Sequence, residues 1–250
     1  MRKPISLSVS ACLLCIVISK NSFAQVARTD SSSQEYAFNN TLTLFYTSLG
    51  EQSPLFNGPE YYFYDPLIKG NAYFSDVNAF APGSVHYDGD FYTGVPMLYD
   101  IYKDEVVVLL YNHFSKFSLV DEKVKSFDFL DHHFVNINAD TLRNNQILTS
   151  GFYDELYNGK TQVLAKRSKS IQTTTGSQAG PESYFDPEIS YFLKKNNVYF
   201  SFSSKGSMLG ILKDKKKEIT QYIKANQIDF RKNPEEAMVQ IASYYDHLIK

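Results

Sequence analysis

A short segment rich in acids and histidines carries the best metal-binding chemistry in the sequence. It reads Asp131-His132-His133, and Asp128 lies three residues before it. Imidazole and carboxylate groups are good ligands for Zn²⁺. Neighbouring side chains of a β-strand point to opposite faces, however, so His132 and His133 cannot easily bind one ion. We therefore predict an ordinary polar turn between two strands, with no metal ligand and no cofactor.

A second acidic pair flanks a glycine. Asp88 and Asp90 lie on either side of Gly89 and could suggest Ca²⁺. The regularly spaced oxygen ligands of a D-x-D-x-D-G loop are missing, though. The segment is more typical of a turn, and we predict one here.

No motif identifies a catalytic group. The sequence has no G-x-S-x-G, and no serine stands in a telling relation to a histidine. His86, His113 and His247 are scattered, and each is predicted to be a half-buried residue of a strand or helix. Acids are numerous, so a carboxylate pair of the glycosidase kind stays open, but no pair is singled out. The catalytic residues are therefore unknown.

Aromatic residues are the unusual part of the composition, with 19 Tyr, 19 Phe and no Trp. They form three clusters: Tyr61, Tyr62, Phe63 and Tyr64; Phe91, Tyr92 and Tyr99; and Tyr191, Phe192, Tyr199, Phe200 and Phe202. Tyrosine suits a surface that stacks on sugars or holds a peptide. In sheets, aromatic residues more often pack across neighbouring strands, and we favour that interpretation.

The first residues have the pattern of a cleavable secretory signal. Arg2 and Lys3 precede an uncharged apolar run over residues 5–18, and Ser22-Phe23-Ala24 forms a small-x-small cleavage site. The run is shorter than the roughly 20 apolar residues that span a bilayer. We predict that residues 1–24 are a signal peptide cleaved after Ala24, and that the mature protein works in the periplasm or at the cell surface.

Lipid attachment is the alternative for this end of the chain. Val9-Ser10-Ala11-Cys12 looks like a lipobox, and a lipidated Cys12 would anchor the protein to a membrane. Half of the apolar run, Leu13 to Ile18, would then stay on the mature protein, which argues against it. Cys12 and Cys15 are the two cysteines of the chain, so the mature protein is expected to have no disulfide.

The charge argues against nucleic acid as a partner. The chain has a formal net charge of −2, and loss of the signal with Arg2, Lys3 and Lys20 leaves the mature protein at −5. An acidic protein has no electrostatic reason to bind nucleic acid. We expect membrane contact only through a lipid on Cys12.

Short aromatic and β-branched runs between turn residues predict many strands. They lie near 61–64, 84–87, 91–101, 106–111, 116–120, 124–130, 134–137, 151–157, 161–171, 184–194 and 198–203. Connections this short favour antiparallel neighbours and hence a meander. A polar segment over residues 25–34 is expected to be a disordered lead-in, and Gln172 to Glu182 a mobile loop.

Helices are predicted at both ends of this sheet. Apolar residues from Phe38 to Leu49 recur at helical spacing. Asp214 to Ala225 forms a second predicted helix, with Lys215 to Lys217 in its first turn. A third helix begins at Asn233, as the capping residue, and Pro234. Its apolar face carries Met238, Ile241, Ala242, Tyr245 and Leu248. The lysine run is interpreted as a solvated face, with docking to an anionic surface as the alternative.

Several motifs in order resemble an uncharacterised family of exported bacterial proteins. They are Leu55-Phe56-Asn57-Gly58-Pro59-Glu60-Tyr61, Lys69-Gly70, Tyr73-Phe74, Tyr87-Asp88-Gly89-Asp90-Phe91-Tyr92, Leu98-Tyr99-Asp100, Gly151-Phe152-Tyr153, Leu212-Lys213-Asp214-Lys215-Lys216 and Tyr244-Tyr245. The resemblance implies one exported β-rich unit and assigns no activity. Tyr87-x-Gly89-x-Phe91-x-x-Gly94 also fits the core of a MORN repeat, but no second copy follows it, so we interpret it as a hairpin turn.

Together these features predict an α+β fold over residues 35–250, formed as a single β-rich domain. It would consist of a large curved antiparallel sheet, as a half-barrel or sandwich, with one N-terminal and two C-terminal helices. The predicted function is non-enzymatic binding or a structural role, with an apolar ligand, a glycan or a protein as partner. The alternative is a secreted hydrolase that uses scattered acidic residues.

Overall fold

The computed structural model describes residues 41, 48, 50, 53–141, 147–175 and 180–249, all within one compact unit, Asn39–Lys250. The predicted signal peptide and lead-in lie outside these residues, and so does nearly all of the predicted helix over residues 38–49. No helix of the described part is both long and apolar enough to cross a membrane.

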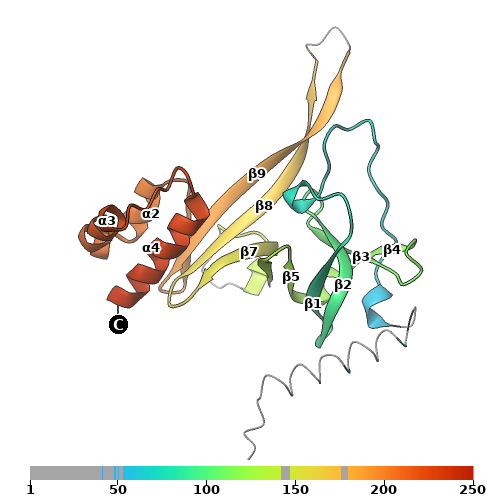
Figure 1. Cartoon of the computed structure of the whole chain (residues 1–250), viewed down its shortest axis with the longest axis horizontal. Helices are drawn as coiled ribbons and strands as arrows, with labels where there is room; N and C mark the ends of the chain where they lie inside the picture. The colour runs from blue at the N-terminus through green and yellow to red at the C-terminus, as the bar shows by residue number, and fades with distance from the viewer. Residues whose placement is uncertain are drawn as a thin grey trace, which may run out of the picture. The chain divides into compact units, whose positions relative to one another are not determined.

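Ten strands form one open antiparallel sheet (Figure 1). They are β1 Ala81–Tyr87, β2 Asp90–Asp100, β3 Glu105–Leu109, β4 Lys116–Ser118, β5 Val124–Phe129, β6 His132–Ile137, β7 Gly151–Asn158, β8 Gln162–Thr174, β9 Glu182–Lys195 and β10 Val198–Phe202. The predicted antiparallel sheet and the α+β class are confirmed. All but one of the predicted strands are present.

The exception is the segment from Tyr61 to Tyr64, which is not a strand. The hydroxyls of Tyr61 and Tyr64 both donate to Oδ2 of the buried Asp100, at 2.8 and 2.6 Å. Residues three apart on a strand would point to opposite faces. The shared acceptor therefore requires a non-strand backbone, and the prediction of a strand here was wrong.

The strand order is β10-β9-β8-β7-β6-β5-β1-β2-β3-β4, which departs from a meander at one place. β4 and β5 are consecutive but do not pair, and β5 pairs with β1 instead. A short 3₁₀ helix, Asp121–Lys123, connects them, and Lys123 lies beside the β1–β2 turn through its bond to Asp88. One non-local pairing thus replaces one predicted hairpin.

Three hairpins use two-residue turns in which both central residues have positive φ. These turns are Asp88-Gly89, Leu130-Asp131 and Asn196-Asn197. Such backbone values define type I′ turns, which match the twist of antiparallel strands. The predicted Asp-Gly turn is confirmed. The predicted Asp131-His132-His133 turn is displaced, because the two histidines already belong to β6.

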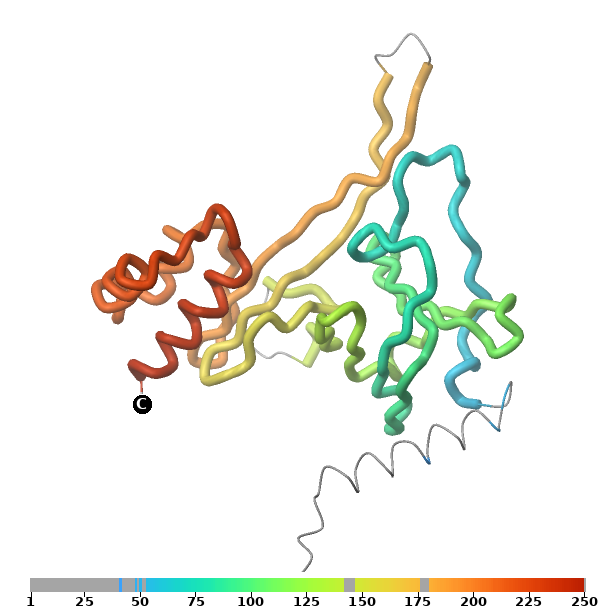
Figure 2. Tube along the Cα trace, in the orientation of Figure 1, coloured from blue at the N-terminus to red at the C-terminus, as the bar shows by residue number. Residues whose placement is uncertain are grey.

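The hairpin of β8 and β9 is longer than predicted. Pairing continues to Thr174 and Glu182, so both ends of the predicted loop over residues 172–182 are strand, and residues 176–179 lie outside the described part of the chain. Residues 57–80 run up to this hairpin and back to β1 (Figure 2). The buried Lys169 holds them, since its Nζ donates to the carbonyl oxygens of Asn71 and Tyr73, at 2.8 and 2.9 Å.

Three helices gather at one end of the β8–β9 hairpin (Figure 1). They are α2 Lys205–Ile211, α3 Lys216–Ala225 and α4 Pro234–Leu248. The two predicted C-terminal helices are confirmed, and α2 was not predicted. Pro234 starts α4 as expected, but the side chain of Asn233 accepts no capping bond and donates instead to Glu236, at 3.1 Å.

Two large groups of buried apolar side chains stabilise this arrangement. One lies among β1 to β7 and includes Tyr99, Phe127 and Phe134, whose rings contact one another at centroid distances of 4.7 to 5.1 Å. The other joins the helices to β8, β9 and β10. The predicted apolar face of α4 is confirmed as buried at Met238 and Ile241. α4 is therefore part of the core.

Candidate functional site

The two histidines weighed as metal ligands, and rejected in favour of a turn, lie on opposite faces of the sheet. His132 Nδ1 lies 2.7 Å from Oδ2 of Asp154, and His133 Nδ1 lies 2.6 Å from Oδ1 of Asp128. Each imidazole thus contacts its own carboxylate, as the alternation of side chains along β6 requires. Among the described residues, no three His, Cys, Asp or Glu side chains are grouped so that they could hold a metal ion.

The other residues considered from the sequence are dispersed. Asp88 pairs with Lys123 at 2.8 Å in the β1–β2 turn. His86 lies in β1 and His247 in α4, as predicted, but His113 lies in a bend. All three are exposed rather than half-buried, so that part of the prediction was wrong. The rings of His86 and Phe91 contact each other in a tilted arrangement, with centroids 4.4 Å apart. The structure brings none of the three together.

The lysine run lies mostly in solvent, as the favoured interpretation expected. Lys216 and Lys217 open α3 and are exposed, whereas Lys215 ends the preceding 3₁₀ turn and lies 3.8 Å from Glu218.

A buried ion network links the sheet to α4. The Arg167 guanidinium donates to Oδ2 of Asp154 from Nε and Nη2, at 2.9 and 2.5 Å, and from Nη2 to Oε2 of Glu235 at 3.0 Å. His132 contacts the same carboxylate oxygen of Asp154, and Tyr191 donates to Glu235. Burial and the charge of Glu235 raise the pKa of Tyr191 to about 12, so its hydroxyl remains a donor. Every charged member has a partner, which is typical of a structural network.

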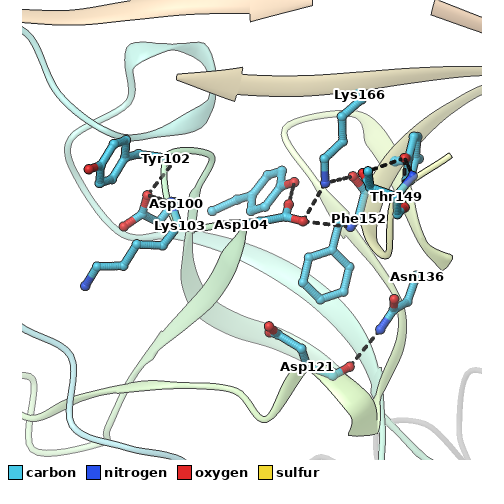
Figure 3. A network of polar contacts seen from close by, with 11 residues as sticks. Asp100, Tyr102, Lys103, Asp104, Asp121, Asn136, Thr149, Phe152 and Lys166 are labelled. Carbon is cyan, nitrogen blue, oxygen red and sulfur yellow. Dashed lines mark hydrogen bonds and ion pairs between the residues drawn. The ribbon is translucent and has the colours of Figure 1, made fainter. Parts of the chain in front are cut away.

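A cavity of about 820 Å³, the acidic cavity, opens where the β2–β3 turn meets the β5, β6 and β7 strands. Its wall contains Asp104, Asp121, Glu122 and Asp140 among lysines and asparagines. Figure 3 shows Asp104 at the centre of a polar network. Asp104 accepts from Tyr99 Oη at 2.6 Å, from Lys166 Nζ at 2.5 Å and from the main-chain N–H of Phe152 at 3.1 Å.

Asp104 and Asp121 differ in what their carboxylates can do. Burial and the charge of Asp104 keep the pKa of Tyr99 well above its usual value, so the Tyr99 hydroxyl remains a donor. Both carboxylate oxygens of Asp104 therefore accept hydrogen bonds within the protein. No hydrogen bond or ion pair of the described residues engages the Asp121 carboxylate; Asn136 binds its main-chain carbonyl at 2.7 Å. Asp121 is exposed at the surface overall, but partial desolvation of its carboxyl group, with the charges of Asp104 and Glu105, raises its pKa to about 7. A carboxyl group with such a pKa can exchange a proton near neutral pH.

A second cavity, the helical cavity, has a volume of about 930 Å³ and lies among α2, α3, the α3–α4 loop and the start of α4. Its apolar lining comes from Ile223, Ile228, Phe230 and Met238. Ile223 and Met238 belong to the buried core, so this apolar surface is fixed in place by packing.

Three cationic side chains surround the apolar lining of the helical cavity. They are Lys205 at the start of α2, Lys224 in α3 and Arg231 in the α3–α4 loop. In the part of the chain that the structure describes, no ion pair or hydrogen bond engages any of the three side chains. Asp229 is the acid of this wall, and it accepts from the main-chain N–H groups of Arg231 and Lys232, at 2.9 and 3.2 Å. The cavity therefore combines an apolar interior with a positive rim.

The aromatic clusters are divided between core and surface. Tyr92, Tyr99, Phe192, Tyr199 and Phe202 are buried, which fits the packing interpretation. Tyr62 and Phe63 are exposed at 69% and 54%, and Lys116 Nζ lies 4.9 Å from the Phe63 ring centroid. Phe200 is exposed at 38%. Packing accounts for most members of the clusters but not for these three.

Sequence reasoning missed Arg167, Asp154, Asp104 and Lys166. Each makes its important contacts with residues far along the chain, such as the 68-residue separation of Arg167 and Glu235. The alternation of side chains along a strand could have identified two of them, because Asp154 and Arg167 occupy inward-facing positions of strands whose other inward positions are apolar. A charged residue at such a position needs a partner.

Comparison with protein-family models, with curated proteins and with solved structures finds no match to this chain. The resemblance to an exported bacterial family therefore stays a prediction.

Proposed function

We propose that this chain is an exported, non-enzymatic binding protein whose ligand is an apolar molecule with an acidic group, held in the helical cavity. The observation that supports this best is the set of three cations without partners around an apolar lining. Small-molecule sites are concave and mostly apolar, with a few polar groups that fix orientation. A carboxylate, sulfonate or phosphate on the ligand would supply the missing partner of Arg231, Lys224 or Lys205.

The charge of the surrounding segment favours an anion further. Between Lys205 and Lys232 the chain has eight Lys or Arg residues and three acids. A field of one sign raises the local concentration of the opposite ion. The rim of the helical cavity is exposed to solvent, so the attraction between its cations and an anionic ligand weakens as the salt concentration rises.

The remaining parts of this proposal come from the sequence. The signal peptide over residues 1–24 supports export, with cleavage after Ala24. A position in the periplasm or at the cell surface follows from it. The curvature of the sheet into a half-barrel and the helix over residues 38–49 stay predictions.

A direct test uses the mature protein and the fluorescent probe anilinonaphthalene sulfonate, which joins apolar rings to an anion. We expect saturable binding, weakened about tenfold or more in the double variant Lys224→Gln/Arg231→Gln, which corresponds to about 1.4 kcal/mol. Lys217→Gln, an exposed lysine of the same helix outside the cavity, is the matched control and should bind as the parent does. Equal binding by the double variant would rule out the helical cavity as the site.

Hydrolysis in the acidic cavity is the second candidate function, and one observation favours it. Asp121 has a pKa of about 7 in a cavity wall, where a carboxyl group can act as a general acid or base near neutral pH. Nitrophenyl esters and glycosides, assayed from about pH 5 to pH 9, test it because a general acid–base group gives rates that depend on its pKa. Turnover lost in Asp121→Asn but kept in Asp140→Asn would support an enzyme.

A further inference from the structure

The two edge strands of the sheet, β4 and β10, differ in whether another segment of the chain pairs with them. At the β4 edge, residues 59–61 lie alongside the strand: the N–H of Tyr61 donates to the carbonyl of Lys116 at 2.8 Å, and the N–H of Ser118 donates to the carbonyl of Pro59 at 2.9 Å. At the opposite edge, β10 pairs with β9 on one side. No other described segment pairs with it.

The register shows which main-chain groups of β10 face outward. Lys195 and Val198 flank the type I′ turn and form a hydrogen-bonded pair, so Phe200 and Phe202 also bond to β9. The N–H and C=O groups of Tyr199 and Ser201 must therefore point away from β9. Within the described residues these groups have no hydrogen-bond partner. They form a two-residue template for another strand.

β10 also lacks the devices that usually protect an edge. Native edge strands carry charged residues, proline or a bulge that prevents pairing. The strand reads Val-Tyr-Phe-Ser-Phe, contains none of the charged residues or proline, and pairs with β9 without a register shift. An unprotected, uncharged edge is a liability unless it is used for binding.

A groove beside this edge leaves space for the side chains of an added strand. It has a volume of about 500 Å³ and lies between β10 and α2. Val198 and Phe200, exposed at 36% and 38%, form one side, and Gly210 and Ile211 of α2 lie on the other. A Cβ atom on Gly210 would meet nothing within 4 Å, so the groove is open there. An apolar side chain fits this space.

Cations gather at the turn end of β10. Lys194 and Lys195 end β9, and Lys213 lines the groove. Lys195 pairs with Asp214, whereas no ion pair of the described residues engages Lys194 or Lys213. An occupant of the edge would therefore be favoured if it placed a carboxylate beside this end.

A second copy of the chain does not meet that requirement. In an antiparallel pair of two β10 strands, Val198 of one copy lies beside Phe202 of the other. Ser203, Ser204 and Lys205 follow Phe202, so the second copy would bring a lysine and no carboxylate to the cationic end. Like charges disfavour that pair.

We propose that β10 is a docking strand for an extended, acidic segment of a partner protein, which joins the sheet by β-strand addition. Main-chain hydrogen bonds to Tyr199 and Ser201 would supply affinity, and the groove beside α2 would select alternate apolar side chains. This surface is separate from the lining of the helical cavity, so it does not depend on the proposed ligand.

The test uses the mature protein, labelled with ¹⁵N, and a blocked heptapeptide of alternating threonine and valine with a glutamate at each end. We expect the amide signals of Tyr199 and Ser201 to shift on titration and their hydrogen exchange to slow. Ser201→Pro removes one of the outward N–H groups that the peptide needs, so it should abolish binding. The variant should still fold, because proline is tolerated at an edge whose N–H faces solvent. Ser201→Ala keeps the N–H and is the matched control.

Two modified peptides keep the proposal falsifiable even if Ser201→Pro fails to fold. N-methylation of the residues that face β10 should abolish binding, and lysine in place of both glutamates should weaken it at least fivefold. Binding that survives N-methylation, or no binding at all, would exclude strand addition. Equal binding of the glutamate-ended and lysine-ended peptides would exclude an acidic partner. Amide shifts that depend on protein concentration without peptide would show that a second copy of the chain occupies β10. Lys224→Gln/Arg231→Gln should bind the peptide normally, which separates this proposal from the proposed function.

Discussion

Arg167 and Glu235 form an ion pair that connects β8 to the first turn of α4, with 3.0 Å between Nη2 and Oε2. The same guanidinium binds Asp154 on β7, so one side chain holds a neighbouring strand and a helix. The Arg167 side chain is 10% exposed and that of Asp154 is 2% exposed. Because both charges are shielded from water, each depends on the other for compensation.

Removing the charge of Asp154 should therefore destabilise the fold strongly. We expect Asp154→Asn to lower the free energy of unfolding by about 3–5 kcal/mol, the usual cost of leaving a buried charge with a lost partner. Urea denaturation measures it. Asp128→Asn is the matched control, since Asp128 also contacts a histidine but is exposed, and it should cost less than about 1 kcal/mol. Equal losses in both variants would show that the Arg167 network is not structural.

The C-terminal helix should be required for stability. Ile241 is 0% exposed, and Asp246 accepts hydrogen bonds from the N–H and Oγ1 of Thr161, at 3.0 and 2.9 Å, at the β7–β8 turn. Burial of each large apolar side chain contributes roughly 1.5–3 kcal/mol, a large share of the 5–15 kcal/mol of a typical domain. A chain ending at Lys232 should lose its cooperative melting transition in circular dichroism. An unchanged melting temperature would show that α4 is an appendage.

Local sequence patterns predicted most strands but not the elements that depend on distant contacts. Alternating aromatic and β-branched residues between turn residues identified β1 to β10, because those preferences are local. α2 escaped prediction because Lys205–Ile211 contains two glycines, which disfavour a helix. It forms through a capping box between Ser204 and Ser207 and through burial of its apolar residues.

The candidate sites were harder to predict than the fold. Asp104 and Lys166 are 62 residues apart, and the helical cavity combines residues of β9, α2, α3, the α3–α4 loop and α4. Neither spacing nor composition indicates such contacts, because they arise from the order of strands in the sheet and from the packing of the helices against it. The wrong prediction at Tyr61 to Tyr64 has the same origin, since the distant Asp100 determines that backbone.

The raised pKa of Asp121 predicts a pH dependence of stability with a definite sign. The carboxyl group moves from its ordinary value of 3.8 to about 7, so the folded protein holds this proton more tightly than the unfolded chain does. Its contribution to stability is therefore complete below the ordinary value and is lost as the pH rises to about 7. Asp121→Asn should melt higher than the parent above this range and equally below the ordinary value of 3.8.

Melting curves recorded across the range measure the difference between the two proteins. Asp140→Asn, which removes another acid from the wall of the same cavity, is the matched control. A constant difference between Asp121→Asn and the parent at every pH would contradict the raised pKa.

The contact that covers the β4 edge should be sensitive to one methyl group. A Cβ atom on Gly58 would lie 1.8 Å from the carbonyl oxygen of Ser118, which belongs to the main chain and cannot rotate away. Gly58→Ala should therefore push residues 59–61 off β4 and break the bonds that Tyr61 and Ser118 make across this contact. We expect faster amide exchange at those two residues and a loss of about 2 kcal/mol or more in the free energy of unfolding measured with urea, comparable to other steric insertions.

Gly210→Ala is the matched control: its Cβ meets nothing within 4 Å, and alanine in a helix should stabilise by about 1 kcal/mol. If Gly58→Ala is as stable as the parent and exchanges at the same rate, residues 59–61 do not protect this edge.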